Sequence, residues 1–195
     1  MSDHPMSPVV AADQPRVLAT LSSAFATDPV ERWLYPDDAV YAEHFPEFIS
    51  AVADRAYETR TAWQLDDFAA VALMLPPGTG TDPERIAALL VDTVAAEKHA
   101  DMFAVLARME AAHPRYPHWY LPWLGVDAAR QSHGIGGQLL AACLDYIDVG
   151  RLPVYLETPN PRNIPFYERH GFVLVGSAES GSCPPVSFML RPAAE

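Results

Sequence analysis

The 195-residue sequence lacks any apolar run of the roughly 18 residues that a membrane-spanning helix needs. Its first five residues, Met1 to Pro5, do not have the basic-then-apolar order of a secretory leader. Two cysteines, Cys143 and Cys183, make no disulfide framework and stand in no metal motif. We therefore expect a cytoplasmic protein that has no membrane partner and binds no metal.

Basic residues are also scarce. The chain has 13 lysines and arginines against 25 aspartates and glutamates, a formal net charge of -12, and Lys98 is its only lysine. A nucleic-acid partner would require a basic face, so this balance argues against one. Long-range attraction favours cationic substrates instead.

The chain is long enough for one domain with a full core and short for two. Apolar periodicity predicts helices over residues 14–26, 38–57, 83–96, 98–111, 134–148 and 162–169. Alternation and turn residues predict strands over residues 61–65, 69–75, 118–127, 154–157, 172–176 and 187–190. This order predicts a single mixed α/β domain over residues 1–195, whose first ten residues form a short edge strand or a frayed tail.

A glycine-rich turn, Gln131-Ser132-His133-Gly134-Ile135-Gly136-Gly137, separates a predicted strand from a predicted helix. Such a turn presents backbone N–H groups at the positive end of the helix dipole. Glycines allow an anion to approach the backbone closely. The turn predicts a phosphate or pyrophosphate site, although a glycine turn alone is also a common structural entry into a helix.

The strand before this turn contains Pro122, which cannot donate a ladder hydrogen bond, and Gly125, which weakens pairing. We expect a bulge or a place where two neighbouring strands part. Parted strands expose backbone groups that a linear amide ligand can pair with. An edge strand with a tolerated proline is the alternative. Strict alternation would put His118, Tyr120, Pro122, Leu124 and Val126 on one face.

These segments resemble the GNAT N-acetyltransferases. The pattern Gln131-x-x-Gly134-x-Gly136 is similar to that family's acyl-CoA pyrophosphate loop. The stretches from Pro153 to Thr158 and from Asn163 to Phe172 are similar to its next two elements. Their residues resemble those of puromycin N-acetyltransferase-like members most. The resemblance is specific over residues 118–176, the acetyl-CoA-binding core, and implies a mixed central sheet with a splayed strand pair and helices on both faces.

The resemblance implies a binding site for acetyl-CoA as cosubstrate. The backbone of Leu124 and Val126 would pair with the pantetheine arm, and a backbone N–H around Leu124 would polarise the acetyl carbonyl. The pyrophosphate would bind the amides of Gly134 to Gln138 and the Gln131 side chain. The family often has Arg or Lys where His133 stands, so we expect affinity to depend more on the amides. The cosubstrate-binding residues are Leu124, Gly125, Val126, Gln131, Ser132, His133, Gly134, Ile135, Gly136, Gly137, Gln138, Asn163 and Tyr167.

The resemblance also implies a catalytic role for Tyr167, which would protonate the departing CoA thiolate. The acceptor amine must lose a proton before it attacks. His118, Glu157 and Glu110 are the candidate bases, directly or through water. Glu157 could equally pair with Arg162 or Arg169, as an ordinary ion pair at a strand end.

We therefore expect direct transfer of an acetyl group to the amine of a small molecule in a ternary complex. No cysteine or serine stands in a motif that indicates a covalent acyl-enzyme. Acetylation of a protein or peptide amine, and acyl-CoA binding without turnover, are the alternatives. A hydroxyl acceptor and a homodimer stay open.

Overall fold

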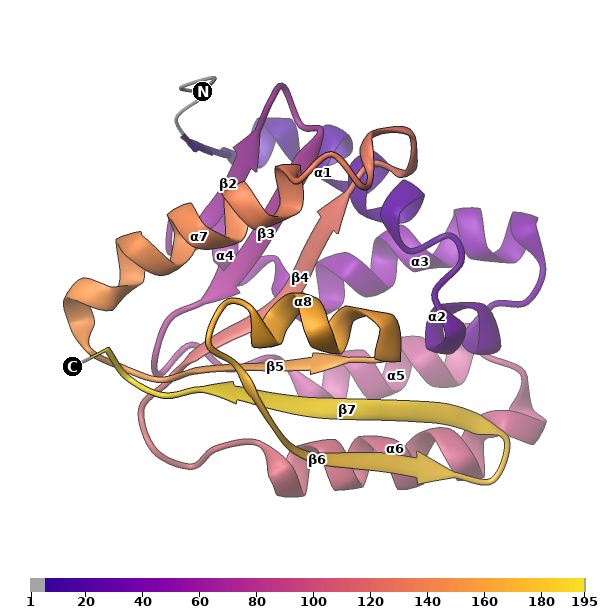
Figure 1. The fold of residues 1–195 in the computed structure, drawn as a ribbon. Helices are drawn as coiled ribbons and strands as arrows, with labels where there is room; N and C mark the ends of the chain where they lie inside the picture. The colour runs from indigo at the N-terminus through magenta and orange to yellow at the C-terminus, as the bar shows by residue number, and fades with distance from the viewer. Residues whose placement is uncertain (1–5, 195) are drawn as a thin grey trace.

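The computed structural model describes residues 6–194, which form one seven-stranded sheet with helices around it (Figure 1). The strands are β1 (Ser7–Pro8), β2 (Ala62–Leu65), β3 (Ala70–Leu75), β4 (Trp119–Val126), β5 (Val154–Thr158), β6 (Val173–Ser180) and β7 (Cys183–Arg191). The α-helices are α1 (Gln14–Ala24), α2 (Pro29–Leu34), α3 (Asp38–Ala53), α4 (Arg55–Glu58), α5 (Pro83–Thr93), α6 (His99–Ala112), α7 (Ile135–Ile147) and α8 (Ile164–Glu168). The 3-10 turns are η1 (Ala11–Asp13), η2 (Ala96–Lys98), η3 (Ala128–Arg130), η4 (Asp148–Gly150) and η5 (Pro161–Asn163).

The sheet has the order β1-β2-β3-β4-β5-β7-β6. Helices α7 and α8 cover one face, where Leu140 and Tyr167 join the same apolar cluster as Ala72. Helices α1 and α3 cover the other face around Val71, and α6 packs there farther along the sheet. The mixed sheet with helices on both faces is confirmed. The predicted amino-terminal edge strand is present as β1, and residues 1–5 of the expected tail lie outside the described residues.

Strands β4 and β5 part soon after they meet. Their parallel pairing consists of Trp119 with Val154 and Tyr120 with Tyr155, and the described sheet contains no further pair between them. Each strand continues beside its other neighbour, β3 or β7. The splayed strand pair that the sequence predicted is therefore present.

A β-bulge lies at Pro122. Leu73 pairs with Trp123, but Leu75 pairs with Tyr120, so β4 has one extra residue over this stretch. The extra residue reverses the alternation of faces. Tyr120 packs on the α6 side, whereas Leu124 and Val126 pack on the α7 side. The prediction that these residues share one face is therefore wrong, because it assumed unbroken alternation.

Gly125 allows α1 to approach β4 closely. A Cβ atom at this position would lie 2.8 Å from Leu21 Cδ2 and 2.9 Å from Ala24 Cβ. The sequence suggested that this glycine weakens strand pairing, yet Gly125 pairs with Val71 in the regular register. Its main structural effect is to bring α1, and the segment that follows it, against β4 near the point where β4 and β5 part.

The last two strands are longer than predicted. They form a hairpin in which Ser180 pairs with Cys183, and a register shift places Pro184 and Pro185 at a bulge. Prolines within a strand pattern argue against a strand. Here they lie beyond the part of β7 that pairs with β5, so the sheet tolerates them.

Candidate active site

The glycine turn enters α7 through a left-handed residue. Gly134, at the N-cap, has a φ of 80°. A Cβ atom on Gly136 would lie 2.9 Å from Val126 Cγ2, so the first turn of α7 packs tightly against the end of β4. Amides in the first turn of a helix have no intrahelical acceptor. By contrast, the Gln138 amide donates to the Gly134 carbonyl at 3.1 Å.

The amides of Leu124 and Val126 point toward the gap that opens where β4 and β5 part. Asp127 N–H donates to the Ala69 carbonyl at 2.9 Å, so Asp127 points toward β3. Successive residues of a strand direct their backbone groups to opposite sides. Gly125 therefore also points toward β3, and its two neighbours point away from it, toward the side where β5 has left.

Two side chains of the glycine turn contact nearby backbone carbonyl groups. Gln131 donates from Nε2 to the Val126 carbonyl at 3.1 Å, which ties the turn to the end of β4. His133 Nδ1 lies 2.7 Å from the Gln131 carbonyl oxygen. These contacts shape the turn, and they direct both side chains toward backbone groups.

A cavity of about 450 Å³, here called the loop cavity, lies between this turn and α8. It is lined by most of the residues assigned to the cosubstrate from sequence: Leu124, Gly125, Val126, Gln131, Ser132, Gly134, Ile135, Gly136, Gly137, Asn163 and Tyr167. Arg130 and Arg169 also line it, and Arg130 pairs with Asp66. Its lining, within the described residues, does not include His133 or Gln138. Helix-terminal amides and two guanidinium groups suit a phosphate-bearing ligand.

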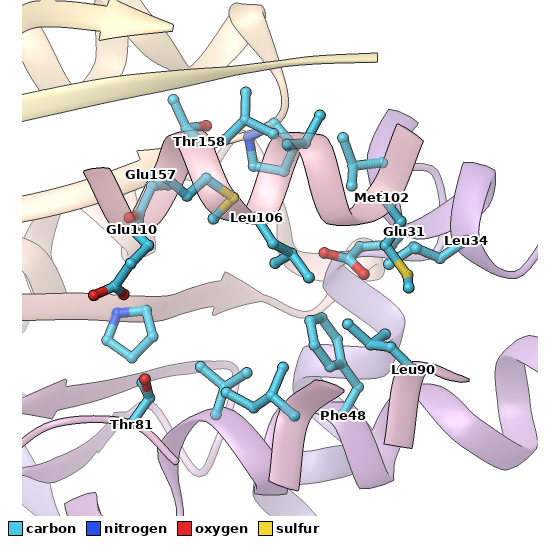
Figure 2. Close-up of a pocket in the computed structure, with 18 of the residues that line it drawn as sticks. Glu31, Leu34, Phe48, Thr81, Leu90, Met102, Leu106, Glu110, Glu157 and Thr158 are labelled. Carbon is cyan, nitrogen blue, oxygen red and sulfur yellow. The ribbon is translucent and has the colours of Figure 1, made fainter. Parts of the chain in front are cut away.

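A second cavity of about 430 Å³, here called the apolar cavity, lies between α2, α3, α5, α6 and the splayed strands (Figure 2). Most of its lining is aliphatic or aromatic, including Phe48, Leu90 and Leu106. Three carboxylate residues, Glu31, Glu110 and Glu157, also line it. The cavity therefore suits a molecule with an apolar body and a positively charged group.

Tyr167 lies where the two cavities meet, since it lines both. Its side chain is 8% exposed. Burial, and then the nearby Asp28 carboxylate, raise the pKa of the Tyr167 hydroxyl. The phenol is therefore protonated at neutral pH and can donate that proton to a group in either cavity.

Asn163 and Leu124 also line both cavities. Asn163 precedes α8 at the N-cap position, yet its side chain makes no cap hydrogen bond. The common structural use of asparagine at a helix start is thus absent here. Its amide group is available to a ligand that extends from one cavity into the other.

Glu157 lies on β5 at the wall of the apolar cavity, and its side chain is 7% exposed. Its Oε1 atom is 3.7 Å from His113 Nδ1, and its Oε2 atom is buried without a hydrogen-bond partner among the described residues. Among the described residues, Glu157 pairs with His113. The ion pair with Arg162 or Arg169, considered as an alternative from sequence, is not formed in this part of the chain. Burial, and then the charge of Glu157, raise the pKa of the Tyr120 and Tyr155 hydroxyls.

His118 reaches this group through a second histidine. Its Nε2 atom is 3.0 Å from His113 Nε2, and its Nδ1 atom is 2.8 Å from the Tyr116 carbonyl oxygen. Burial lowers the pKa of His118. Among the described residues, His113 and not His118 lines the apolar cavity. A row of contacts thus leads from buried Glu157 through His113 to His118, near the surface.

The sequence analysis did not assign five residues of the two cavities to the site: Asp28, Glu31, His113, Arg130 and Arg169. Asp28 caps α2, accepting from Val30 N–H at 3.0 Å and from Glu31 N–H at 3.4 Å. Burial raises the pKa of Asp28 to about 6. From sequence, the Asp28-Pro29 pair indicated only the end of the first predicted helix, and His113 stood in a predicted loop. Only the packing of α2 and α6 beside the splayed strands brings Glu31 and His113 to the apolar cavity and Asp28 to the loop cavity.

Neither a metal centre nor a membrane helix is found in the described part of the chain. Residues 6–194 contain no group of three or more His, Cys, Asp or Glu residues placed to hold a metal ion. No helix within the same range is both long and apolar enough to cross a membrane.

Known proteins are similar to this chain in sequence and fold. A family model described as an acetyltransferase (GNAT) domain matches residues 86–174, which include β4, the glycine turn and α8. An uncharacterized N-acetyltransferase of Schizosaccharomyces pombe is 26% identical over 179 residues, 85% of this chain and 72% of the relative.

Two solved structures are similar over nearly the whole chain. One, described as histone acetyltransferase HPA2 and related acetyltransferase, from Corynebacterium glutamicum, is 26% identical with a TM-score of 0.69, and the match covers 98% of this chain and 97% of that one. The other, polyamine N-acetyltransferase of Drosophila melanogaster, shares the fold at 14% identity and a TM-score of 0.66, over 97% of this chain and 100% of that one. The domain match falls on the segment that builds most of the loop cavity, so the chain contains a GNAT acetyltransferase domain and is similar in sequence and fold to known N-acetyltransferases.

Proposed function

We propose that this protein transfers the acetyl group of acetyl-CoA directly to the amine of a small molecule. The observation that carries the proposal is the position of Tyr167, which lines both the loop cavity and the apolar cavity. One side chain can therefore act on a thioester held from one side and on an amine held from the other. The net charge of -12 supports a cationic acceptor.

The loop cavity fits the cosubstrate. Acetyl-CoA, which GNAT enzymes generally use, supplies an acetyl group activated as a thioester. The amides at the start of α7, with Arg130 and Arg169, would hold its phosphates. The amides of Leu124 and Val126 face the splay, where they would pair with its amide-bearing arm. The Leu124 amide would also polarise the acetyl carbonyl.

Tyr167 acts as the general acid in this proposal. A carbon–nitrogen bond forms as the carbon–sulfur bond breaks, and the sulfur receives the phenol proton. The second proton that the amine nitrogen loses as it becomes an amide then restores the phenol. The products are an amide and the free thiol of CoA. Because burial raises the pKa of Tyr167, its hydroxyl carries the proton at the start of each turnover.

Glu157 acts as the base. A primary amine in water is mostly protonated at neutral pH and must lose a proton before it attacks. Glu157 lines the apolar cavity with one buried carboxylate oxygen that has no hydrogen-bond partner within residues 6–194. His113 and His118 would carry the proton onward to the surface, along contacts of 3.7 Å and 3.0 Å. His118, named from sequence as a base, would serve as the outer member of this relay.

Direct transfer agrees with the state of the two cysteines. Burial raises the pKa of Cys143 to about 12 and that of Cys183 to about 11. Neither thiol therefore has appreciable thiolate character at neutral pH. Cys143 also belongs to the apolar core under α7.

The test is release of CoA thiol from acetyl-CoA in the presence of small amines, with peptides bearing free N-termini or lysines as the comparison. We expect small amines to be acetylated, with the amide identified by mass spectrometry. If only peptides were acetylated, the acceptor would be a protein and not a small molecule. Binding of acetyl-CoA with no turnover for any amine or peptide would show a non-catalytic acyl-CoA-binding module.

A further inference from the structure

Glu31 is a buried acidic residue that the proposed reaction does not use. It lies in the first turn of α2 and is 4% exposed. Its Oε2 atom is buried with no hydrogen-bond partner in the described part of the chain. Figure 2 shows its carboxylate directed into the apolar cavity. A buried carboxylate without a partner is costly, so a carboxylate kept in this position indicates a ligand group that pairs with it.

The neighbouring charged side chains are engaged elsewhere. Arg32 pairs with Asp38 at 2.6 Å and donates to the Pro36 carbonyl at 2.8 Å. Lys98 donates to the Trp33 carbonyl and lies over the Trp33 ring. Asp28 uses its carboxylate to cap α2. None of these groups neutralises Glu31 from within the protein.

Glu31 and the catalytic carboxylate lie at different ends of the apolar cavity. In Figure 2, Glu31 is near Met102 and Leu34, whereas Glu157 and Glu110 lie together at the opposite side with Leu106 between. Met102, Leu106 and Glu110 follow one another at intervals of four along α6 and all line the cavity. At 1.5 Å per residue, the helix rises roughly 12 Å from Met102 to Glu110. The cavity thus has an acidic group at each end and an apolar wall between.

We infer that the acceptor carries two cationic groups joined by an apolar spacer, one of them the amine that is acetylated near Glu157 and the other an ammonium or guanidinium group that binds Glu31. This inference rests on the proposed function, because it assigns the substrate class of the same site. A charged donor opposite a buried carboxylate forms a strong, charge-assisted hydrogen bond. Burial, and then the charge of Asp28, raise the pKa of Glu31, and a bound cation offsets both causes.

The test compares α,ω-diaminoalkanes with n-alkylamines of matched chain length. For the wild-type protein, we expect kcat/KM for the best diamine to exceed that of the matched monoamine by about ten- to a hundredfold, the value of one hydrogen bond to a charged group. Glu31→Gln should abolish the preference for the diamine, because it lowers kcat/KM for the diamine far more than for the monoamine. Glu43→Gln removes one acidic charge from an exposed position on α3, outside the cavity, and should keep the preference.

A second measurement avoids the variant, in case Glu31→Gln does not fold. Diamines with both nitrogens fully methylated cannot accept an acetyl group, and they should inhibit monoamine acetylation far better than matched trialkyl monoamines. Equal inhibition, equal turnover of diamines and monoamines, or an equal loss for both in Glu31→Gln would overturn the inference while leaving the proposed function intact. If no amine is acetylated, the proposed function fails and this inference with it.

Discussion

The carboxylate of Glu157 lies 3.7 Å from the imidazole of His113 at the wall of the apolar cavity. This contact begins the path by which a proton would leave the acceptor amine. Glu157→Gln keeps the shape of the side chain and removes the base, so kcat should fall by about 10²- to 10⁴-fold. Glu110→Gln tests the other carboxylate candidate, which is exposed, and a larger loss in that variant would transfer the role of base to Glu110.

Tyr167→Phe removes the hydroxyl of the tyrosine that lines both cavities. We expect kcat to fall by about 10²- to 10⁴-fold while the Kd for acetyl-CoA changes little, because the ring remains in place. Steady-state kinetics and calorimetry measure the two quantities. Tyr146→Phe, at an exposed position on α7, is the matched control. Undiminished turnover in Tyr167→Phe would remove the general-acid role.

Arg169→Gln should weaken acetyl-CoA binding by about tenfold at low salt and less at high salt, because the lost attraction to phosphate is screened by ions. Calorimetric titration at two salt concentrations measures this. Arg162→Gln removes the same charge from an exposed residue outside the loop cavity and should leave affinity unchanged. Equal affinities in the two variants would exclude Arg169 from phosphate binding.

Gly125→Ala should destabilise the fold by about 1–3 kcal/mol, because the new methyl group overlaps Leu21 and Ala24 of α1. Urea unfolding gives the change. Gly150→Ala is the control, since a Cβ atom there meets nothing within 4 Å. If both variants unfold at the same urea concentration, the close approach of α1 does not restrict the size of the residue at position 125.

Asp28 makes stability depend on pH. Its pKa is raised from 3.8 to about 6 in the folded protein, chiefly by burial. The folded state therefore holds this proton more tightly than the unfolded chain, and the free energy of unfolding falls as pH rises from about 4 to about 6.

Asp28→Asn removes the free-energy cost of ionising a buried carboxyl group. Asparagine is also a good helix cap. Above this window the variant should be more stable than the wild type by up to roughly 3 kcal/mol, and below it the difference should vanish. Denaturant unfolding across the window measures the difference. A variant that is less stable at neutral pH would show that the charged form of Asp28 supports the fold.

Several features of the site were predictable because their causes are local. Gly134 adopts a positive φ at the start of α7, which glycine does without strain, so the turn could be read from its residues. Pro122 cannot complete a ladder, and the bulge and the splay both occur beside it. The order of these segments along the sequence matches the GNAT pattern.

Other features depend on contacts between distant segments. The bulge reverses the faces of β4, so Tyr120 and Leu124 pack on opposite sides although their spacing predicts one side. Pairing with β3 determines where that extra residue is accommodated. The longer β6–β7 hairpin likewise depends on a bulge at Pro184 and Pro185 that sequence pattern alone does not predict.

The resemblance to the GNAT family, the glycine turn and the motif that contains Asn163 and Tyr167 could be recognised in the sequence by itself, because each depends on residues that lie close together along the chain. The tertiary structure alone decided which carboxylates share the apolar cavity. Glu31, Glu110 and Glu157 come from three separate elements, α2, α6 and β5, and they line one cavity only because these elements pack around the splayed strands. Burial then removes water from Glu31 and Glu157, and that change in environment supports the roles proposed for these two glutamates.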